Sequence, residues 1–174
     1  MKRREQREHV FKLLFMMQFN SEEEMTEQVS LYFESLEVPD EESRKSIQKR
    51  YENVLAHLEE IDGILNEYSR GWKTSRMSRV DLSALRLAVY EMKFEEDVPV
   101  GVAINEAVEL AKCFGGETSG SFVNGVLGKI ASGRKDDDIP QKTPARGEHR
   151  AKIILRSKAD KEKKAETESV PETK

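Results

Sequence analysis

Apolar residues recur at three- and four-residue spacing along most of this 174-residue chain, the pattern of helices that bury one face. A first helix is predicted over about 4–19, with Val10, Leu13, Leu14 and Met17 on its buried face. No alternation of useful length indicates a strand. The pattern therefore predicts an all-α protein.

The next predicted helix is capped by Asn20 or Ser21, and its apolar stripe ends where Pro39 breaks the chain. One long helix over about 41–69 follows, because its apolar positions continue without a break. A basic connection leads to a fourth helix over about 79–94.

Two further helices are predicted towards the end of the patterned region. Pro99 suits the first turn of one helix, and Gly115 is expected to end it with a left-handed backbone. The last helix covers about 120–132, with Thr118 or Ser119 as its cap.

The composition changes after Arg134. The remaining residues hold eleven basic and nine acidic side chains and little to bury, so their ordering entropy is not offset. We therefore expect a helical domain over 1–134 and a charged, disordered tail over 135–174. The exception is Ile153-Ile-Leu155, flanked by basic residues, which can order on a partner.

The net charge of −4 conceals an asymmetry. Residues 1–12 carry five basic and two acidic side chains, and residues 70–86 carry five basic and one acidic. Residues 13–69 carry four basic and fourteen acidic. Because the positive charge is concentrated in two short segments, an acidic protein of this kind can still bind a polyanion locally.

Catalytic chemistry has little support in the sequence, so an enzyme is not expected, and no cofactor or metal is predicted. The three histidines, His9, His57 and His149, lack metal-ligand spacing, and no glycine-rich phosphate loop is present. The single cysteine, Cys113, excludes an intrachain disulfide, fits the cytoplasm, and is expected to be packed. No apolar run is long enough to span a membrane.

The N-terminal cluster of Lys2, Arg3, Arg4 and Arg7 is a candidate for RNA binding. On a helix, Arg3 and Arg7 project from one face. Guanidinium groups pair with phosphate and stack on bases, which suits flexible single-stranded RNA. The alternative is a solvated first turn in which neighbouring glutamates pair with the arginines.

Three aromatic residues, Phe15, Phe114 and Phe122, are candidates for stacking on bases at the edge of a groove. Thr118 and Ser119 would supply hydroxyl groups beside them. The alternative is that the aromatic rings pack in the core and that one hydroxyl caps the last helix.

The segments Leu85–Met92, Val102–Lys112 and Phe122–Leu127, together with Arg3-Arg4-x-x-Arg7-Glu8, resemble the NusB family of bacterial transcription antitermination factors. The resemblance covers roughly residues 3–132. It implies two packed helical bundles of about three helices each. It also implies binding to boxA-type RNA together with the ribosomal protein NusE. The complex acts with RNA polymerase and other Nus factors on ribosomal RNA operons.

Carried over to this chain, the family's RNA-binding residues fall on the basic and aromatic candidates already named. Phe15 stands where relatives usually have tyrosine, so the phenolic hydroxyl is missing. Thr118 stands where some members have an acidic residue, which should reduce repulsion of phosphate.

The same resemblance places NusE on the helices around residues 76–110, with Arg79, Arg86 and Glu91 as contacts. Deletion of residues 1–7 is expected to abolish RNA binding and to leave folding intact. Two other functions stay open: a helical scaffold that binds only proteins, and an RNA-targeting module like that of ribosomal RNA cytosine methyltransferases.

Overall fold

The structure is a computed structural model that describes residues 1–36 and 40–134. Within these residues the chain forms helices and no strand, so the all-α prediction is confirmed. The helices are α1 (Arg3–Met16), α2 (Glu22–Ser35), α3 (Glu41–Ala56), α4 (Leu58–Tyr68), the short 3₁₀ helix η1 (Thr74–Arg76), α5 (Arg79–Phe94), α6 (Val100–Phe114) and α7 (Ser119–Ser132).

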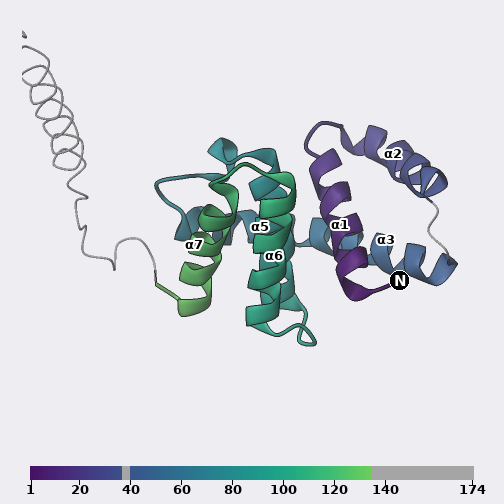
Figure 1. The fold of residues 1–174 in the computed structure, drawn as a ribbon. Coiled ribbons are helices and arrows are strands. Elements are labelled where there is room, and N and C mark those ends of the chain that lie inside the picture. The colour runs from purple at the N-terminus through teal and green to yellow at the C-terminus, as the bar shows by residue number, and fades with distance from the viewer. Residues whose placement is uncertain (37–39, 135–174) are drawn as a thin grey trace, which may run out of the picture. The chain divides into compact units, whose positions relative to one another are not determined.

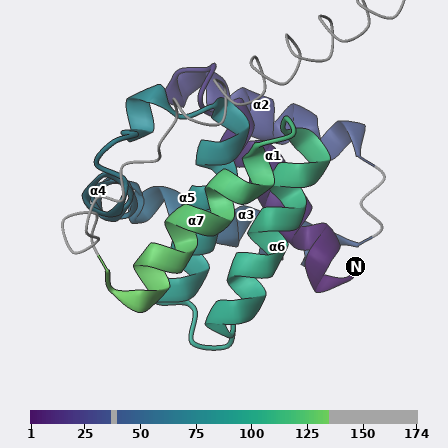
Figure 2. The ribbon, with the colours of Figure 1, turned by 60° about the vertical axis from the view of Figure 1, so that its left-hand side comes forward.

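The helices form two groups that meet at α5. The first group contains α1, α2 and α3, and the second contains α4 to α7 (Figures 1 and 2). Within the second group α6 packs against both α5 and α7, and α1 joins the groups by packing against α3 and α5. The predicted arrangement of two packed helical bundles is therefore confirmed.

Helix α5 is buried on all sides rather than along one stripe. Every residue from Asp81 to Glu91 is buried, including the charged side chains of Arg86 and Glu91. The apolar stripe of the sequence predicted only one covered face. The difference arises because α1, α4, α6 and α7 surround this helix, and its charged residues must find partners inside the protein.

One of the two caps predicted for the second helix is confirmed: Ser21 caps α2. The Ser21 hydroxyl accepts a hydrogen bond from the Glu24 amide, and the Glu24 carboxylate accepts one from the Ser21 amide. This reciprocal pair satisfies two amides that the helix itself leaves unbonded. Ser78 caps α5 by accepting a hydrogen bond from the Asp81 amide, without the reciprocal bond.

Two predicted helix ends were wrong. The helix predicted over 41–69 is interrupted at His57, which ends α3 and precedes α4. The His57 ring lies 4.1 Å from that of Phe94, so packing against α5 fixes this break, which no proline or glycine announces. The first helix ends at Met16 rather than near 19, and the Asn20 side chain donates to the Met16 carbonyl.

Gly115 ends α6, but not with the left-handed backbone that was predicted. Its φ of −102° is open to any residue. Glycine is required here for space: a Cβ would lie 2.6 Å from the Ala111 carbonyl oxygen and would press on the Ser119 hydroxyl. The left-handed cap belongs instead to Gly133, with φ of 67°, after α7. The predicted break at Pro39 and the predicted disordered tail lie outside the described residues.

Gly115→Ala is expected to lower the free energy of unfolding by about 1–3 kcal/mol, because the backbone around it must move to admit the methyl group. Gly116→Ala is the matched control, since a Cβ at Gly116 meets nothing within 4 Å. Urea denaturation of both variants checks this. Equal midpoints for the two variants would contradict the close approach at Gly115.

Candidate nucleic-acid interface

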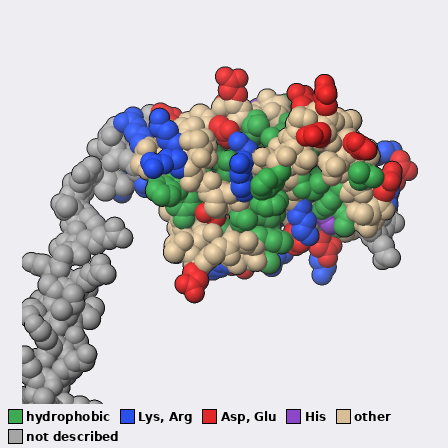
Figure 3. All heavy atoms as spheres, turned by 90° about the horizontal axis from the view of Figure 1, so that it is seen from above, with side chains coloured by type: hydrophobic (Ala, Val, Ile, Leu, Met, Phe, Trp, Pro, Cys, Tyr) green, Lys and Arg blue, Asp and Glu red, His purple; other side chains and the backbone are tan. Residues whose placement is uncertain are grey.

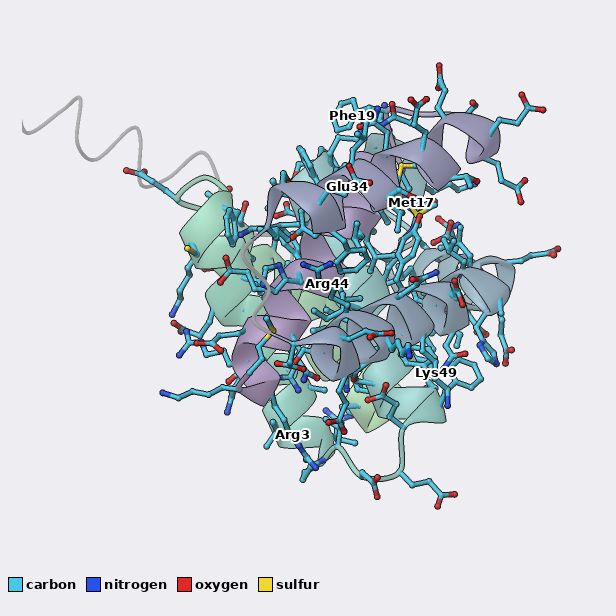
Figure 4. The ribbon with its side chains drawn as sticks, turned by 90° about the vertical axis from the view of Figure 1, so that its right-hand side faces the viewer. Arg3, Met17, Phe19, Glu34, Arg44 and Lys49 are labelled. Carbon is cyan, nitrogen blue, oxygen red and sulfur yellow. The ribbon has the colours of Figure 1, made fainter. Side chains whose placement is uncertain are left out.

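The N-terminal basic cluster divides into exposed and buried members. Lys2, Arg3 and Arg4 are exposed at the start of α1, as the solvent-facing Arg3 in Figure 4 illustrates. Arg7 is only 5% exposed, although helical spacing placed it on one face with Arg3. The cluster therefore supplies three accessible cations, and Arg7 lies inside the protein.

Arg7 is held by a buried ion pair with Glu91 of α5. Its Nε lies 2.8 Å from the Glu91 carboxylate. Its terminal nitrogen Nη1 lies 3.6 Å from the carboxylate of Glu106 on α6. Arg50 of α3 approaches the same Glu91 oxygen at 3.4 Å and also pairs with Glu95. This network joins four helices around one carboxylate.

Two opposing effects shift the pKa values in this network: burial disfavours each charged group, and the neighbouring opposite charges favour it. Burial raises the pKa of Glu91, and the guanidinium groups of Arg7 and Arg50 oppose that rise. Burial alone would lower the pKa of Arg50, but the hydrogen bond from Arg50 to Glu95 and the charge of Glu91 raise it. The second Glu91 oxygen has no hydrogen-bond partner, so the charge of this carboxylate depends on the two arginines.

The accessible face of α1 lies beside α6, and the two helices run in the same direction (Figure 1). Near the start of the pair, Arg4 lies within 4 Å of Glu106 and Glu109. Near its end, the Lys12 ammonium lies 5.7 Å from the centre of the Phe114 ring. We call Arg4, Lys12 and Phe114 the α1–α6 surface, in which Arg4 and Phe114 are exposed and Lys12 is half-buried.

Phe114 is presented to solvent by packing behind it. Its ring lies 5.1 Å from that of the buried Phe11, and 39% of the residue is exposed. An aromatic face beside an ammonium group is a surface on which a base can stack while a phosphate is neutralised. This geometry favours the stacking role over the alternative of pure core packing for Phe114.

The loop from Gly115 to Thr118 continues this surface towards α7. Thr118 is exposed, whereas Ser119 is buried, and neither side chain caps α7 by a hydrogen bond in the described residues. Phe122 is half-buried and packs against the core. Of the loop candidates, Thr118 is therefore the hydroxyl that a ligand can reach.

Phe15 lies further along α1 and is half-buried. Its ring packs 5.1 Å from that of Phe19, which is exposed in the turn after the helix. Phe15 therefore supports an exposed aromatic residue that the sequence analysis did not single out.

The three predicted protein contacts are placed differently from one another. Glu91 is 1% exposed and lies in the ion-pair network, so it offers no surface to a partner. Arg86 is also buried, and its Nε and one terminal nitrogen donate to the two carboxylate oxygens of Asp62. Only Arg79 is exposed. The two buried residues act in the fold, because the helix that carries them is central.

Two further observations concern chemistry that this surface does not show. Cys113 is exposed, so its predicted packing was wrong. Across residues 1–36 and 40–134 no group of three histidine, cysteine or carboxylate side chains is placed to hold a metal ion. Nor does any helix there have the length and apolar character to cross a membrane.

Comparison with known proteins decides the family. The model of the NusB family matches residues 4–132. This chain belongs to the NusB family. Transcription antitermination protein NusB of Agathobacter rectalis is 50% identical over 125 residues, which are 72% of this chain and 95% of that relative. The protein of the same name from Lachnoclostridium phytofermentans is 50% identical over 130 residues, 75% of this chain and 98% of that relative.

Solved NusB structures share the fold. T. maritima NusB superposes with a TM-score of 0.67 at 35% identity, and the match covers 79% of this chain and 96% of that one. A chain from the crystal structure of antitermination factors NusB and NusE in complex with dsRNA superposes with a TM-score of 0.63 at 27% identity. That match covers 75% of this chain and 96% of the other.

Sequence reasoning missed Lys12 as part of the candidate interface of this NusB-family protein. The available signal was spacing: Arg4, Glu8 and Lys12 are four residues apart, so they follow one another along one helix face. The segment 1–7, whose deletion was expected from the sequence to leave folding intact, contains the buried Arg7. Its deletion would remove a buried ion pair together with the exposed cations.

Glu91→Ala is expected to lower the free energy of unfolding by about 3–5 kcal/mol, because it leaves the buried guanidinium of Arg7 without its partner. Glu109→Ala removes a half-exposed carboxylate from Arg4 and should change stability by no more than about 0.5 kcal/mol. Chemical denaturation of both variants measures the difference. If Glu91→Ala unfolded at the same midpoint as the control, the network would not be holding the helices together.

Proposed function

We propose that this chain is a transcription antitermination factor that binds boxA-type single-stranded RNA together with NusE. It acts within the RNA polymerase complex in the cytoplasm, through binding rather than catalysis. The observation that carries this proposal is the α1–α6 surface, where the exposed Arg4 and the half-buried Lys12 lie along α1 and Lys12 lies beside the exposed ring of Phe114. Family membership and the antitermination names of its relatives support it.

The RNA contacts follow from the chemistry of this surface. Arg4 and Lys12 neutralise phosphates, and Phe114 stacks on a base beside Lys12. Lys2 and Arg3 extend the positive charge at the start of α1, and Thr118 offers a hydroxyl at the other end. The related structure contains double-stranded RNA. We favour single-stranded RNA here because an exposed ring can stack only on an unpaired base.

Three acidic side chains compete with phosphate for the cations of this surface. Glu106 and Glu109 lie within 4 Å of Arg4, and Glu8 pairs with Lys12 at 2.7 Å. A bound phosphate must therefore compete with these carboxylates. Salt should weaken binding strongly, as for other contacts in which cations are exchanged for phosphates.

For NusE we propose the exposed part of residues 76–110. The first turn of α6 presents Val100 and Val102, which are 43% and 44% exposed. Exposed apolar side chains on a helix suit a protein partner better than a polyanion. Arg79, at the N-terminal end of α5, stays a candidate contact of the same partner.

Joint binding would then be cooperative. RNA and NusE occupy separate surfaces of one small protein, so each raises the effective concentration of the other when the two partners also touch. The α1–α5–α6 core fixes the two surfaces relative to each other.

Arg4→Gln with Lys12→Gln is expected to weaken RNA binding and to reduce the slope of log Kd against log salt by about 1.4, the value for two phosphate contacts on a single strand. Phe114→Ala should cost about 1–3 kcal/mol of binding free energy. Fluorescence anisotropy with a labelled boxA-type RNA and a scrambled RNA measures both effects.

The control for these variants is Lys45→Gln with Lys49→Gln, which removes two exposed charges from α3, where Lys49 is labelled in Figure 4. Equal loss of affinity in the control and in the Arg4/Lys12 variant would mean that net charge alone governs binding. In that case the α1–α6 surface would not be the RNA site.

Thr118→Asp is expected to weaken RNA binding, because it places a negative charge at the end of the α1–α6 surface. Thr118→Asn, of the same size and without the charge, is the control. Anisotropy titrations at two salt concentrations compare them. Unchanged or improved affinity of Thr118→Asp would remove the loop from the interface.

A further inference from the structure

A second basic and aromatic surface lies in the loop before α5. Residues 70–80 contain four cations and no carboxylate, in a chain whose net charge is negative. In this loop the chain's single tryptophan, Trp72, is 48% exposed. The Arg76 guanidinium lies 5.7 Å from the centre of its ring.

The loop holds this surface in a fixed conformation. The side chain of Asn66, on α4, bonds to both the backbone amide and the hydroxyl of Thr74, at 2.9 and 3.2 Å. The Ser69 hydroxyl donates to the Trp72 carbonyl. These bonds turn the backbone inward, so that Trp72, Lys73 and Arg76 project to solvent.

Three cations of the loop are available to a ligand. Within the described residues, Lys73, Arg76 and Arg79 have no carboxylate within ion-pair distance. Arg79 lies 5.2 Å from the centre of the Phe19 ring and donates to the Gln18 carbonyl. Two aromatic rings thus each lie beside a guanidinium group that forms no ion pair with a described carboxylate.

This surface is connected to the α1–α6 surface through the end of α1. Phe15 packs on Phe19, and Phe19 packs under Arg79. The turn after α1, the η1 loop and the α6–α7 loop lie at the same end of the described unit in two views (Figures 1 and 2). Figure 3, which looks down on this end, shows basic side chains gathered at one edge and apolar side chains reaching the surface.

A hollow between the turn and the loop could receive part of a ligand. Gln18, Thr74 and Arg79 line it, and the Gln18 side-chain oxygen is buried without a hydrogen-bond partner. Because that oxygen is buried, a ribose hydroxyl or a base N–H group can bond to it only when the Gln18 side chain turns towards the hollow. Arg79 at the rim can pair with the adjoining phosphate.

We propose that this region is a second RNA subsite, in which a base stacks on Trp72 and the adjoining phosphates pair with Arg76 and Arg79. It extends the same strand beyond the α1–α6 surface and rests on the proposed function. It also gives Arg79 to the RNA rather than to the protein partner. Unpaired cations over exposed rings match a flexible nucleic acid, whose every unit offers both a phosphate and a π face.

The direct test uses the fluorescence of Trp72 in the full chain without NusE. The probes are a boxA-type RNA and two longer forms, each extended by about six single-stranded nucleotides at one end. One longer form should quench Trp72 and bind more tightly than the short RNA. Absence of quenching by both longer forms, with no gain in affinity, would overturn the proposal.

The variant test compares Arg76→Gln/Arg79→Gln with Lys45→Gln/Lys49→Gln, which removes the same charge from α3. The longer RNA should bind the unmodified chain roughly five- to 150-fold more tightly than the short RNA, if the gain equals one stacked base. Arg76→Gln/Arg79→Gln should abolish this gain in affinity. Affinity for the short RNA should be unchanged in that variant. The salt dependence for the longer RNA should lose a slope of about 1.4.

Three results would contradict the subsite. If the two double variants weakened binding of the longer RNA equally, net charge alone would explain the loss of affinity. Loss of NusE binding by Arg76→Gln/Arg79→Gln, with RNA affinity intact, would assign the surface to a protein. Failure of the short RNA to bind the unmodified chain would overturn the proposed function itself, and with it this extension.

Discussion

The fold depends on one buried carboxylate. Glu91 lies in the central helix, and the guanidinium groups of Arg7 and Arg50 reach it from α1 and α3. A carboxylate with this little exposure is tolerated only when opposite charges replace the lost water. The requirement fixes α1 against α5, and through Glu106 it brings α6 into the same network. The two helical groups are joined at this point.

This constraint also sorts the N-terminal arginines into two roles. Arg7 turns inward to Glu91, whereas Arg4, three residues before it, and Lys12, five residues after it, lie beside α6. The parallel course of α1 and α6 then sets Lys12 against Phe114. A buried ion pair thus positions the cations that we propose to bind RNA.

The proposed RNA surface is built from turns that are distant in the sequence. The ends of α1 and α6 and the loop before α5 meet at one end of the unit (Figure 1). Each contributes an exposed aromatic residue with a cation near its ring: Phe19, Phe114 and Trp72. Binding by an acidic protein is then a local property. The net charge describes the whole chain, whereas phosphates respond to charges within about 10 Å.

The sequence by itself determined most of the helices, the Ser21 cap and the family. Helical periodicity, capping and motif order depend only on the identity and spacing of residues near one another in the sequence. Only the tertiary structure decided which faces are covered by helices distant in sequence. Packing interrupts the predicted long helix at His57 and leaves no space for a side chain at Gly115. It also leaves Cys113 exposed, and it buries three charged residues: Arg7, Arg86 and Glu91. A charged residue looks the same in the sequence whether it faces water or an opposite charge. Its role therefore depends on partners that only packing brings within reach.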